Sequence, residues 1–358
     1  MIRVGMLTSG GDCQALNPTM RAIARTLYTY YDNEVEIIGF MDGYFGLMYG
    51  EYKKLQRSDF SGLLTRGGTI LGTSRQPFKL MEVPDERGLD KVQAMIQTYH
   101  KLRLDCLFVL GGNGSQKTAY LLSQKGLNVI GLPKTIDNDL WGTDMTFGFN
   151  SAVQIATQAI DCIHTTAASH NRVFIVEIMG HKVGSLTLEA GLAGGADVIL
   201  IPEIPYDIKK VADAVMKRKI AGRGFTVIAV AEGAISKEDA KLSKKDYKKK
   251  QENSLYPSIS YEIAAQLSEM CQIDCRVTVP GHTQRGGAPS PYDRALSSRF
   301  GAHAGYLCHK GIFGKLVVIK EGKVTDIPME ESAGKLKYVD PNSDEVRAAR
   351  LLGLSFGD

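Results

Sequence analysis

The sequence predicts an α/β protein in which mainly parallel sheets are covered by helices on both faces. Short runs that are apolar throughout alternate along the chain with longer amphipathic stretches. Parallel strands are buried on both faces, and the helices that connect them cover the sheet, so this alternation is typical of such a fold. The length of 358 residues allows two lobes or one extended domain.

The predicted elements follow one another as strand, loop and helix. Eight short apolar runs are predicted strands, and they cover residues 4–7, 35–40, 106–110, 128–132, 173–178, 197–201, 225–231 and 276–279. Helical periodicity predicts helices between them over residues 17–30, 117–125, 151–166 and 208–221. A strand, a helix and a second strand in this order form a unit whose two strands are parallel.

Glycine-rich or polar loops follow six of the predicted strands. In chain order they read TSGGD, GGNGS, PKTIDND, MGHKVG, EG and PGHTQRGG. Ligands of open parallel sheets bind at the carboxyl ends of the strands. We therefore expect these loops to form one site at one edge.

Two of these loops are suited to phosphate. Gly10 and Gly11 precede one predicted helix, and Gly111, Gly112 and Gly114 precede another. A glycine turn that opens a helix lets backbone N–H groups approach a phosphate closely. Either turn alone could be only a tight connection, whereas two of them suggest a bound polyphosphate. The sequence has no GxxxxGK[ST] motif and no GxGxxG after its first strand, which excludes a P-loop.

The segment PKTIDND places Asp137 and Asp139 two residues apart. In an extended segment such residues project to the same side, so the two carboxylates would share a site. A nearby cation would keep both ionised, with Asp139 holding Mg²⁺ and Asp137 taking a proton from an attacking hydroxyl. Lys134 and Thr135 would lie near a transferred phosphoryl group. The alternative is an Asx-rich turn with capping aspartates.

Basic residues near strand ends suggest a clamp for a substrate phosphate. Arg172, His282 and Arg285 flank strand ends, and Arg276 opens the last predicted strand. A lone arginine is usually a surface ion pair, but several guanidinium forks around one site match phosphate oxygens. Glu232, at the end of another predicted strand, would accept hydrogen bonds from sugar hydroxyls.

Composition excludes several other classes. A net charge of +4 does not by itself indicate nucleic-acid binding, and six cysteines without paired metal spacing argue against zinc and disulfides. The N-terminus resembles neither a signal peptide nor a transit peptide, and no apolar run approaches the ~20 residues of a membrane span. We expect a cytoplasmic protein. The lysine-rich segment 237–253 is expected to be a solvated helix or a mobile loop, with a polyanion-binding tail as the alternative.

Together these motifs resemble the bacterial 6-phosphofructokinases over nearly the whole chain. In order they are LTSGGD, DGYFGL, RGGTILGTSR, GGNGS, PKTIDND, TFGF, SHNRV, EIMG, LAGGAD, AEG and GHTQRGG. The resemblance implies two similar lobes, with the phosphoryl donor on residues 1–148 plus about 284–334 and the sugar phosphate on 149–283 plus about 335–358. It also implies phosphorylation of fructose 6-phosphate at carbon 1 in glycolysis, by a homotetramer or dimer whose active sites are shared between subunits.

The resemblance assigns a role to each matching residue. Asp137 would be the general base, and Thr135, Lys134 and Gly11 would act at the transferred group. Asn113 and Asp139 would belong to the magnesium region. The donor would be surrounded by Gly11, Tyr44, Arg75, Gly112, Asn113, Gly114 and Ser115. The sugar phosphate would contact Thr135, Asp137, Asp139, Met179, Gly180, His181, Glu232, His282 and Arg285. Arg172 and Arg276 would reach it across a subunit boundary.

Three positions depart from the common ATP-dependent pattern. Asn113 replaces an aspartate associated with Mg²⁺ and adds no negative charge. Lys134 replaces a glycine and is typical of pyrophosphate-dependent members and of a related group that uses ATP. His181 stands where many relatives have arginine. Gly114 favours ATP, because the aspartate of pyrophosphate-dependent relatives would crowd and repel the α-phosphate of a nucleotide.

Three alternatives stay open on the sequence alone. The first is a phosphofructokinase that uses pyrophosphate as the donor. The second is a non-catalytic regulatory paralogue, which only Asn113 supports. The third is a glycine-loop kinase acting on NAD or lipid, which would leave the second half of the chain unexplained.

Overall fold

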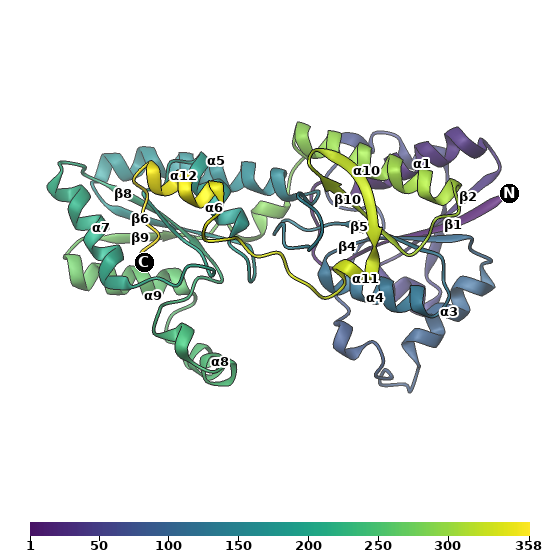
Figure 1. Cartoon of the computed structure of the whole chain (residues 1–358), viewed down its shortest axis with the longest axis horizontal. Coiled ribbons are helices and arrows are strands. Elements are labelled where there is room, and N and C mark those ends of the chain that lie inside the picture. Colours follow the sequence, from purple (N-terminus) through teal and green to yellow (C-terminus); the bar gives the residue numbers. More distant parts are fainter. The chain divides into compact units, whose positions relative to one another are not determined.

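The computed structural model describes residues 1–358, which form two compact units (Figure 1). Unit 1 comprises Met1–Ser151 and Arg285–Lys337, and unit 2 comprises Ala152–Gln284 and Tyr338–Asp358. Each unit has its own sheet and its own apolar core. The α/β fold class predicted from the sequence is confirmed.

The sheet of unit 1 has seven strands in the order β11-β10-β5-β4-β1-β2-β3, and that of unit 2 has four in the order β7-β8-β6-β9. The strands of unit 1 are β1 Ile2–Ser9, β2 Val35–Phe40, β3 Tyr52–Leu55, β4 Cys106–Gly111, β5 Val129–Pro133, β10 Lys315–Lys320 and β11 Lys323–Pro328. Those of unit 2 are β6 Val173–Ile178, β7 Val198–Leu200, β8 Thr226–Ala231 and β9 Cys275–Thr278. All pairs are parallel except β2–β3 and β10–β11.

Helices cover both faces of each sheet. Those of unit 1 are α1 Leu16–Tyr31, α2 Tyr44–Tyr49, α3 Lys91–Lys101, α4 Asn113–Gln124, α10 Pro291–His309 and α11 Met329–Ser332, with the 3₁₀ turns η1 Arg57–Phe60, η2 Leu63–Thr65 and η3 Phe78–Leu80. Those of unit 2 are α6 Ser185–Ala193, α7 Ile208–Ile220, α8 Lys244–Glu252, α9 Ile259–Cys271 and α12 Asp344–Leu351, with η4 Asp239–Lys241. Two elements, α5 Phe149–His170 and η5 Gly281–Arg285, run through the unit boundaries. In Figure 1, α1 and α10 cover one face of the unit 1 sheet, and α3 and α4 cover the other.

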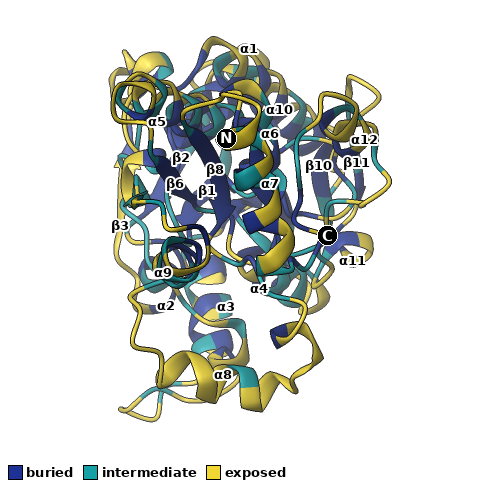
Figure 2. Cartoon of the chain, turned by 90° about the vertical axis from the view of Figure 1, so that its left-hand side faces the viewer, coloured by how far each residue is buried: buried dark blue, intermediate teal, exposed yellow.

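The strands that precede the site loops form the centres of the two cores. Every residue of β4, β5, β6 and β8 is buried, and Figure 2 shows the labelled central strands in dark blue. Burial on both faces removes apolar area from water at roughly 25 cal/mol per Å². The rigid strand ends therefore fix where each following loop begins.

Three strands were absent from the sequence predictions. The edge strand β3 has three exposed residues out of four, so its hydrophobic signal is weak. β10 and β11 form a hairpin with Lys320 opposite Lys323. Its turn residues Glu321 and Gly322 both have positive φ, +50° and +74°, which is the conformation of a two-residue type I′ hairpin turn.

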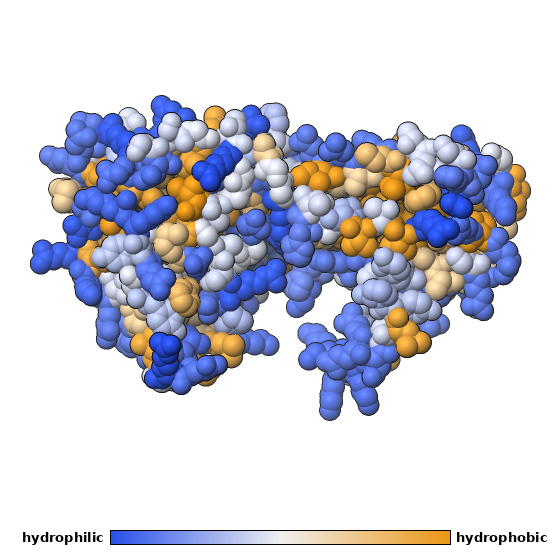
Figure 3. Space-filling view, turned by 180° about the vertical axis from the view of Figure 1, so that it is seen from behind, coloured by the Kyte–Doolittle hydropathy of each residue, from blue (hydrophilic) through white to orange (hydrophobic).

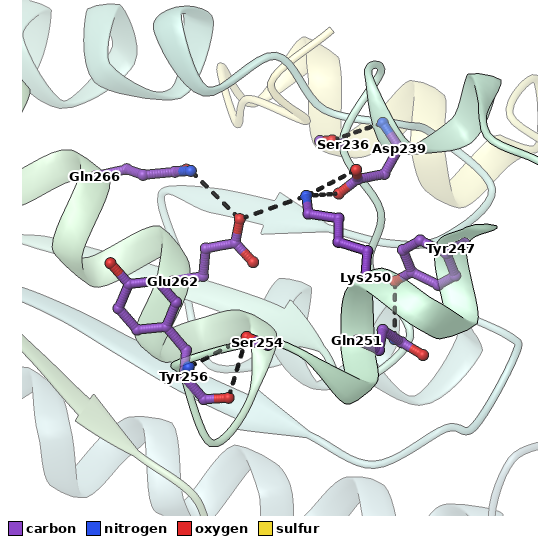
Figure 4. A network of polar contacts seen from close by, with 9 residues as sticks. All are labelled: Ser236, Asp239, Tyr247, Lys250, Gln251, Ser254, Tyr256, Glu262 and Gln266. Carbon is purple, nitrogen blue, oxygen red and sulfur yellow. Dashed lines mark hydrogen bonds and ion pairs between the residues drawn. The ribbon is translucent and has the colours of Figure 1, made fainter.

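The lysine-rich segment contains the solvated helix α8, as expected. None of its residues is buried, and it projects from unit 2 as a hydrophilic surface (Figures 1 and 3). Lys250 attaches it to the unit, with its Nζ 2.8 Å from Asp239 and 3.8 Å from Glu262 (Figure 4). No helix in the chain has the length and hydrophobicity required to cross a membrane.

Candidate active site

The six predicted site loops follow strands of two sheets. TSGGD, GGNGS and PKTIDND follow β1, β4 and β5 of unit 1, whereas the other three follow β6, β8 and β9 of unit 2. The expectation that all six line one edge is therefore wrong, because the chain forms a separate sheet in each unit.

The glycine turn after β1 is fixed by neighbouring backbone. Gly10 has φ +86°, a left-handed conformation that favours glycine. Its N–H donates to the Ser74 carbonyl at 3.1 Å, and its carbonyl accepts from the Thr73 hydroxyl at 2.6 Å. Helix α1 begins only at Leu16. The helix predicted over 17–30 is confirmed, and residues 12–15 separate its first N–H groups from the glycine turn.

The loop after β4 does open a helix directly. Gly112 is the N-cap of α4, and no side chain caps this end. The first N–H groups of a helix have no intrahelical partner, and together with the helix dipole they favour a bound anion. Gly114 is exposed, and a Cβ added there would meet no atom within 4 Å. Packing does not require glycine at this position.

Lys134 lies buried between the glycine loops and is only 3% exposed. Its Nζ donates to the Gly11 carbonyl, and its backbone N–H donates to the Gly111 carbonyl at 3.1 Å. Burial lowers the pKa of Lys134, because a desolvated ammonium is disfavoured. This residue connects all three loops of unit 1.

The PKTIDND segment is not extended through its two aspartates. Ile136 and Asp137 form a bend, and Asn138 has φ +51°. The Asn138 side chain stabilises this conformation, because its Oδ1 accepts from the Thr146 N–H at 3.1 Å. The alternation that was expected to place Asp137 and Asp139 on one side therefore does not apply. Asp137 is half-buried, while Asp139 is buried.

Thr135 supports the bend from within. Its hydroxyl accepts a hydrogen bond from the Asp137 N–H at 3.0 Å, and its carbonyl accepts from the Thr146 hydroxyl at 2.8 Å. The backbone beside the Asp137 carboxylate is thus held on both sides of the bend. This is the rigidity that a positioned acid or base requires.

Asn113 and Asp139 have properties that suit a magnesium site. The Asn113 Nδ2 donates to the Lys335 carbonyl at 2.7 Å, and its Oδ1 is buried without a hydrogen-bond partner. The Asp139 carbonyl accepts from the Lys337 N–H at 2.9 Å, so both loops contact the segment 335–337. No group of three or more His, Cys, Asp or Glu side chains could hold a metal by itself. Mg²⁺ commonly takes only one or two protein ligands and completes its shell with phosphates and water.

Tyr44 and Arg75, both expected at the donor, occupy different environments. Tyr44 is buried, and its hydroxyl donates to the Ser115 carbonyl at 2.7 Å. Tyr44 therefore supports the GGNGS loop from beneath and would act on a donor through that loop. Arg75 is exposed and forms no ion pair within the chain. It directly follows Ser74, whose carbonyl accepts from the Gly10 N–H.

Arg285 lies against the first glycine turn in unit 1. Its Nη1 donates to the Asp12 carbonyl at 2.8 Å. A Cβ on Gly11 would lie 2.8 Å from the same nitrogen, so the missing side chain of Gly11 makes room for the guanidinium. Arg285, which was expected beside the sugar phosphate, thus contacts the TSGGD turn, and the ligand that it binds stays a prediction.

Glu232 holds the loop that follows β6 in unit 2. Its Oε1 accepts from the Gly180 N–H at 3.2 Å and from the His181 N–H at 2.7 Å. The side chains of His181 and Glu232 are exposed. One carboxylate oxygen thus fixes the loop after β6, and the other makes no hydrogen bond to the chain.

The loop after β9 carries two of the polar side chains of this region, one exposed and one buried. His282 is exposed on η5, and Gln284 is fully buried. The Gln284 Oε1 accepts from the Met179 N–H at 3.3 Å. Met179, Gly180, Glu232 and His282 therefore all lie in loops at the carboxyl end of the unit 2 sheet.

Arg172 and Arg276 lie at the other end of that sheet. Arg172 directly precedes β6, and Arg276 is the second residue of β9, paired with Phe174. Asp274 forms ion pairs with both arginines, at 2.8 Å and 2.9 Å. A six-residue strand is roughly 20 Å long. These arginines therefore do not share a phosphate with the loops at the carboxyl end of the same sheet.

Two polar side chains brace the loops of unit 1: Ser115, which was expected at the donor, and Gln116, which sequence reasoning missed. The Ser115 hydroxyl donates to the Ser9 hydroxyl at 3.0 Å, which joins the loops after β4 and β1. Gln116 donates to backbone carbonyls of both β4 and β5. The position of Gln116 directly after the GGNGS motif was the only signal that could have identified it.

Comparison with known proteins agrees with the motifs. The family described as Phosphofructokinase matches residues 3–308. An ATP-dependent 6-phosphofructokinase of Spirochaeta thermophila is 53% identical over 99% of this chain and 97% of its own length. ATP-dependent 6-phosphofructokinase 3 of Bacteroides thetaiotaomicron is 43% identical over 99% of this chain and 100% of its own length.

Solved structures show the same relationship. The phosphofructokinase of Saccharomyces cerevisiae superposes with a TM-score of 0.79 at 30% identity, covering 93% of this chain and 45% of that one. A pyrophosphate-dependent phosphofructokinase of Marinobacter aquaeolei has a TM-score of 0.80 at 20% identity, covering 99% of this chain and 88% of that one, and shows the shared fold alone. The chain belongs to the phosphofructokinase family.

Proposed function

We propose that the chain transfers the terminal phosphoryl group of ATP to the 1-hydroxyl of fructose 6-phosphate, giving fructose 1,6-bisphosphate in glycolysis. Relatives at 42–53% identity over nearly the whole chain are named ATP-dependent 6-phosphofructokinases, in agreement with the sequence prediction. The observation that carries the proposal is the buried Lys134, which joins the two glycine turns to the segment that carries the half-buried Asp137.

The residues of unit 1 supply the chemistry of the transfer. Asp137 takes the proton of the sugar hydroxyl as that oxygen attacks phosphorus. The N–H groups at the start of α4 and the ammonium of Lys134 stabilise negative charge on the donor phosphates. The Thr135 hydroxyl, which accepts from the Asp137 N–H, keeps the base loop in one conformation.

Magnesium would be held by Asn113 and Asp139 together with the donor phosphates. Asn113 Oδ1 is a buried acceptor without a partner, which suits a cation. When bound, the ion would neutralise phosphate charge during transfer. The amide contributes no formal charge, so Asp139 would be the anionic ligand.

The sugar phosphate would bind the loops at the carboxyl end of the unit 2 sheet. Glu232, whose second oxygen makes no hydrogen bond to the chain, would accept from sugar hydroxyls. Arg172 and Arg276, at the opposite end, would serve the sugar phosphate of a partner subunit in a homodimer or homotetramer. Two guanidinium groups share the single carboxylate of Asp274, which leaves positive charge for a phosphate.

Pyrophosphate is the second candidate donor, because Lys134 adds a buried cation beside the glycine loops. The test compares turnover of the purified protein with ATP and with pyrophosphate at equal concentration under Mg²⁺. We expect ATP to be preferred at least about tenfold, equivalent to ~1.4 kcal/mol. Gly114→Asp, which the open space at this position accommodates, should lower ATP use.

Two other results of the donor comparison would contradict the proposal. Turnover with pyrophosphate alone would overturn the donor assignment while keeping the reaction class. Absence of turnover with both donors would refute the kinase proposal and favour the regulatory paralogue.

A further inference from the structure

Gln116 occupies an unusual position under the two loops of unit 1. It is the fourth residue of α4 and is only 2% exposed. Its Nε2 lies within hydrogen-bond distance of the carbonyls of Leu132, Gly111 and Val109, at 2.9, 3.0 and 3.3 Å. Carbonyl oxygens can only accept, so the amide nitrogen must be the atom that faces them.

These carbonyls belong to the ends of two neighbouring strands. Val109 and Gly111 are in β4, Leu132 is in β5, and the two strands are paired in parallel with Leu110 opposite Leu132. A carbonyl has two lone pairs and can accept from Gln116 in addition to a backbone donor. The Gly111 carbonyl accepts from both the Gln116 Nε2 and the Lys134 N–H.

The Oε1 end of the Gln116 amide occupies the space that the missing side chain of Gly131 leaves open. A Cβ on Gly131 would lie 2.2 Å from the Gln116 Oε1, so position 131 must be glycine for the amide to lie flat against β5. The same Oε1 is buried without a hydrogen-bond partner. A buried unsatisfied acceptor is unfavourable, and an apolar side chain of similar length would avoid it.

We propose that Gln116 is a positioning residue that fixes the spacing between the donor loop at the start of α4 and the base loop that carries Asp137. The inference rests on the proposed function for what each loop binds. Its physical basis is that one amide group bonds to Gly111, the last residue of β4, and to Leu132, the penultimate residue of β5. A displacement of about 1 Å between reacting groups can reduce a rate by about 100-fold.

The experiment uses the full-length protein with Gln116→Met, which keeps side-chain length and removes both donors. Gln124→Met, an exposed change on the same helix, is the matched control for helix propensity. We expect kcat to fall about 10- to 100-fold in Gln116→Met. The KM for fructose 6-phosphate should change less than about threefold, because the proposed sugar contacts lie in unit 2.

Hydrogen exchange gives a readout that does not depend on activity. Amide exchange over residues 112–116 and 134–139 should accelerate in Gln116→Met and stay unchanged in Gln124→Met. Unchanged exchange or unchanged kcat in folded Gln116→Met would overturn the inference. An inactive wild-type protein would instead refute the proposed function, and the exchange data would still decide the role of Gln116.

A second variant covers the case in which Gln116→Met does not fold. Gln116→Glu can donate one proton to the carbonyls only when its carboxyl is protonated. Its kcat relative to wild type should therefore rise as pH falls, whereas a ratio independent of pH would contradict positioning by hydrogen-bond donation.

Discussion

The loops of unit 1 that we propose to bind the donor (the donor side) and the loops of unit 2 that we propose to bind the sugar phosphate (the sugar side) both follow parallel strands. They are nevertheless built differently. In unit 1 the polar residues Lys134, Thr135 and Asp139 are only 3, 7 and 8% exposed. In unit 2 the side chains of His181, Glu232 and His282 are exposed. The chain itself buries these donor-side residues, although the Asn113 Oδ1 and Gln116 Oε1 atoms have no hydrogen-bond partner, whereas the sugar-side residues are exposed.

The difference in burial bears on the two proposed roles, which are phosphoryl transfer in unit 1 and sugar-phosphate binding in unit 2. A buried, cross-braced site is preorganised, so its dipoles need little reorganisation when charge develops. An exposed site contributes binding energy only when a ligand or another subunit covers it. We therefore expect changes in unit 1 to act mainly on turnover and changes in unit 2 mainly on sugar-phosphate affinity.

The largest effect should come from Asp137→Asn. Removing the proton acceptor should lower kcat by about 10²- to 10⁴-fold, with KM for fructose 6-phosphate within about threefold of wild type. Steady-state kinetics with ATP measures both constants. Asp161→Asn, an exposed carboxylate on α5, is the matched control. Near-normal turnover of Asp137→Asn would refute the assignment of Asp137 as the general base.

An intermediate effect is expected from Arg172→Ala. Loss of a charge-assisted hydrogen bond of about 1.5–3 kcal/mol should raise the KM for fructose 6-phosphate roughly 10- to 100-fold. Arg347→Ala, an exposed arginine of the same unit that pairs with Asp344, should leave KM unchanged.

Mixed oligomers test whether Arg172 acts on a partner. Chains carrying Arg172→Ala and chains carrying Asp137→Asn would be co-expressed with different tags and purified through both. A shared site predicts more activity in the hybrid than the mean of the two parent oligomers, since some sites regain both residues. Activity equal to that mean would place Arg172 in its own subunit's site.

The sequence was sufficient to predict the strands at the centre of each sheet and the loops that follow them. Continuous apolar runs indicate buried strands, and glycines indicate the turns that follow. It failed where one side chain decides local geometry. Asn138 bends the PKTIDND segment, and Gln116 resembles an ordinary polar residue of an amphipathic helix. The place of Arg172 was readable from its position just before a strand, since Met179, just after that strand, must lie at the opposite end.

The smallest effect, and the sharpest contrast between buried and exposed charge, concerns Lys134. Burial lowers its pKa in the folded chain below the ordinary value of 10.5. Between those two pKa values the unfolded chain binds more protons, so this residue makes the free energy of unfolding rise with pH. The slope of this rise cannot exceed about 1.4 kcal/mol per pH unit.

Denaturant unfolding at pH 8 and pH 10 measures this contribution. The free energy of unfolding should rise in wild type and in the exposed control Lys125→Met, and it should rise less in Lys134→Met. Equal rises in all three proteins would mean that Lys134 titrates as if solvated, and the donor side would then be no more desolvated than the sugar side.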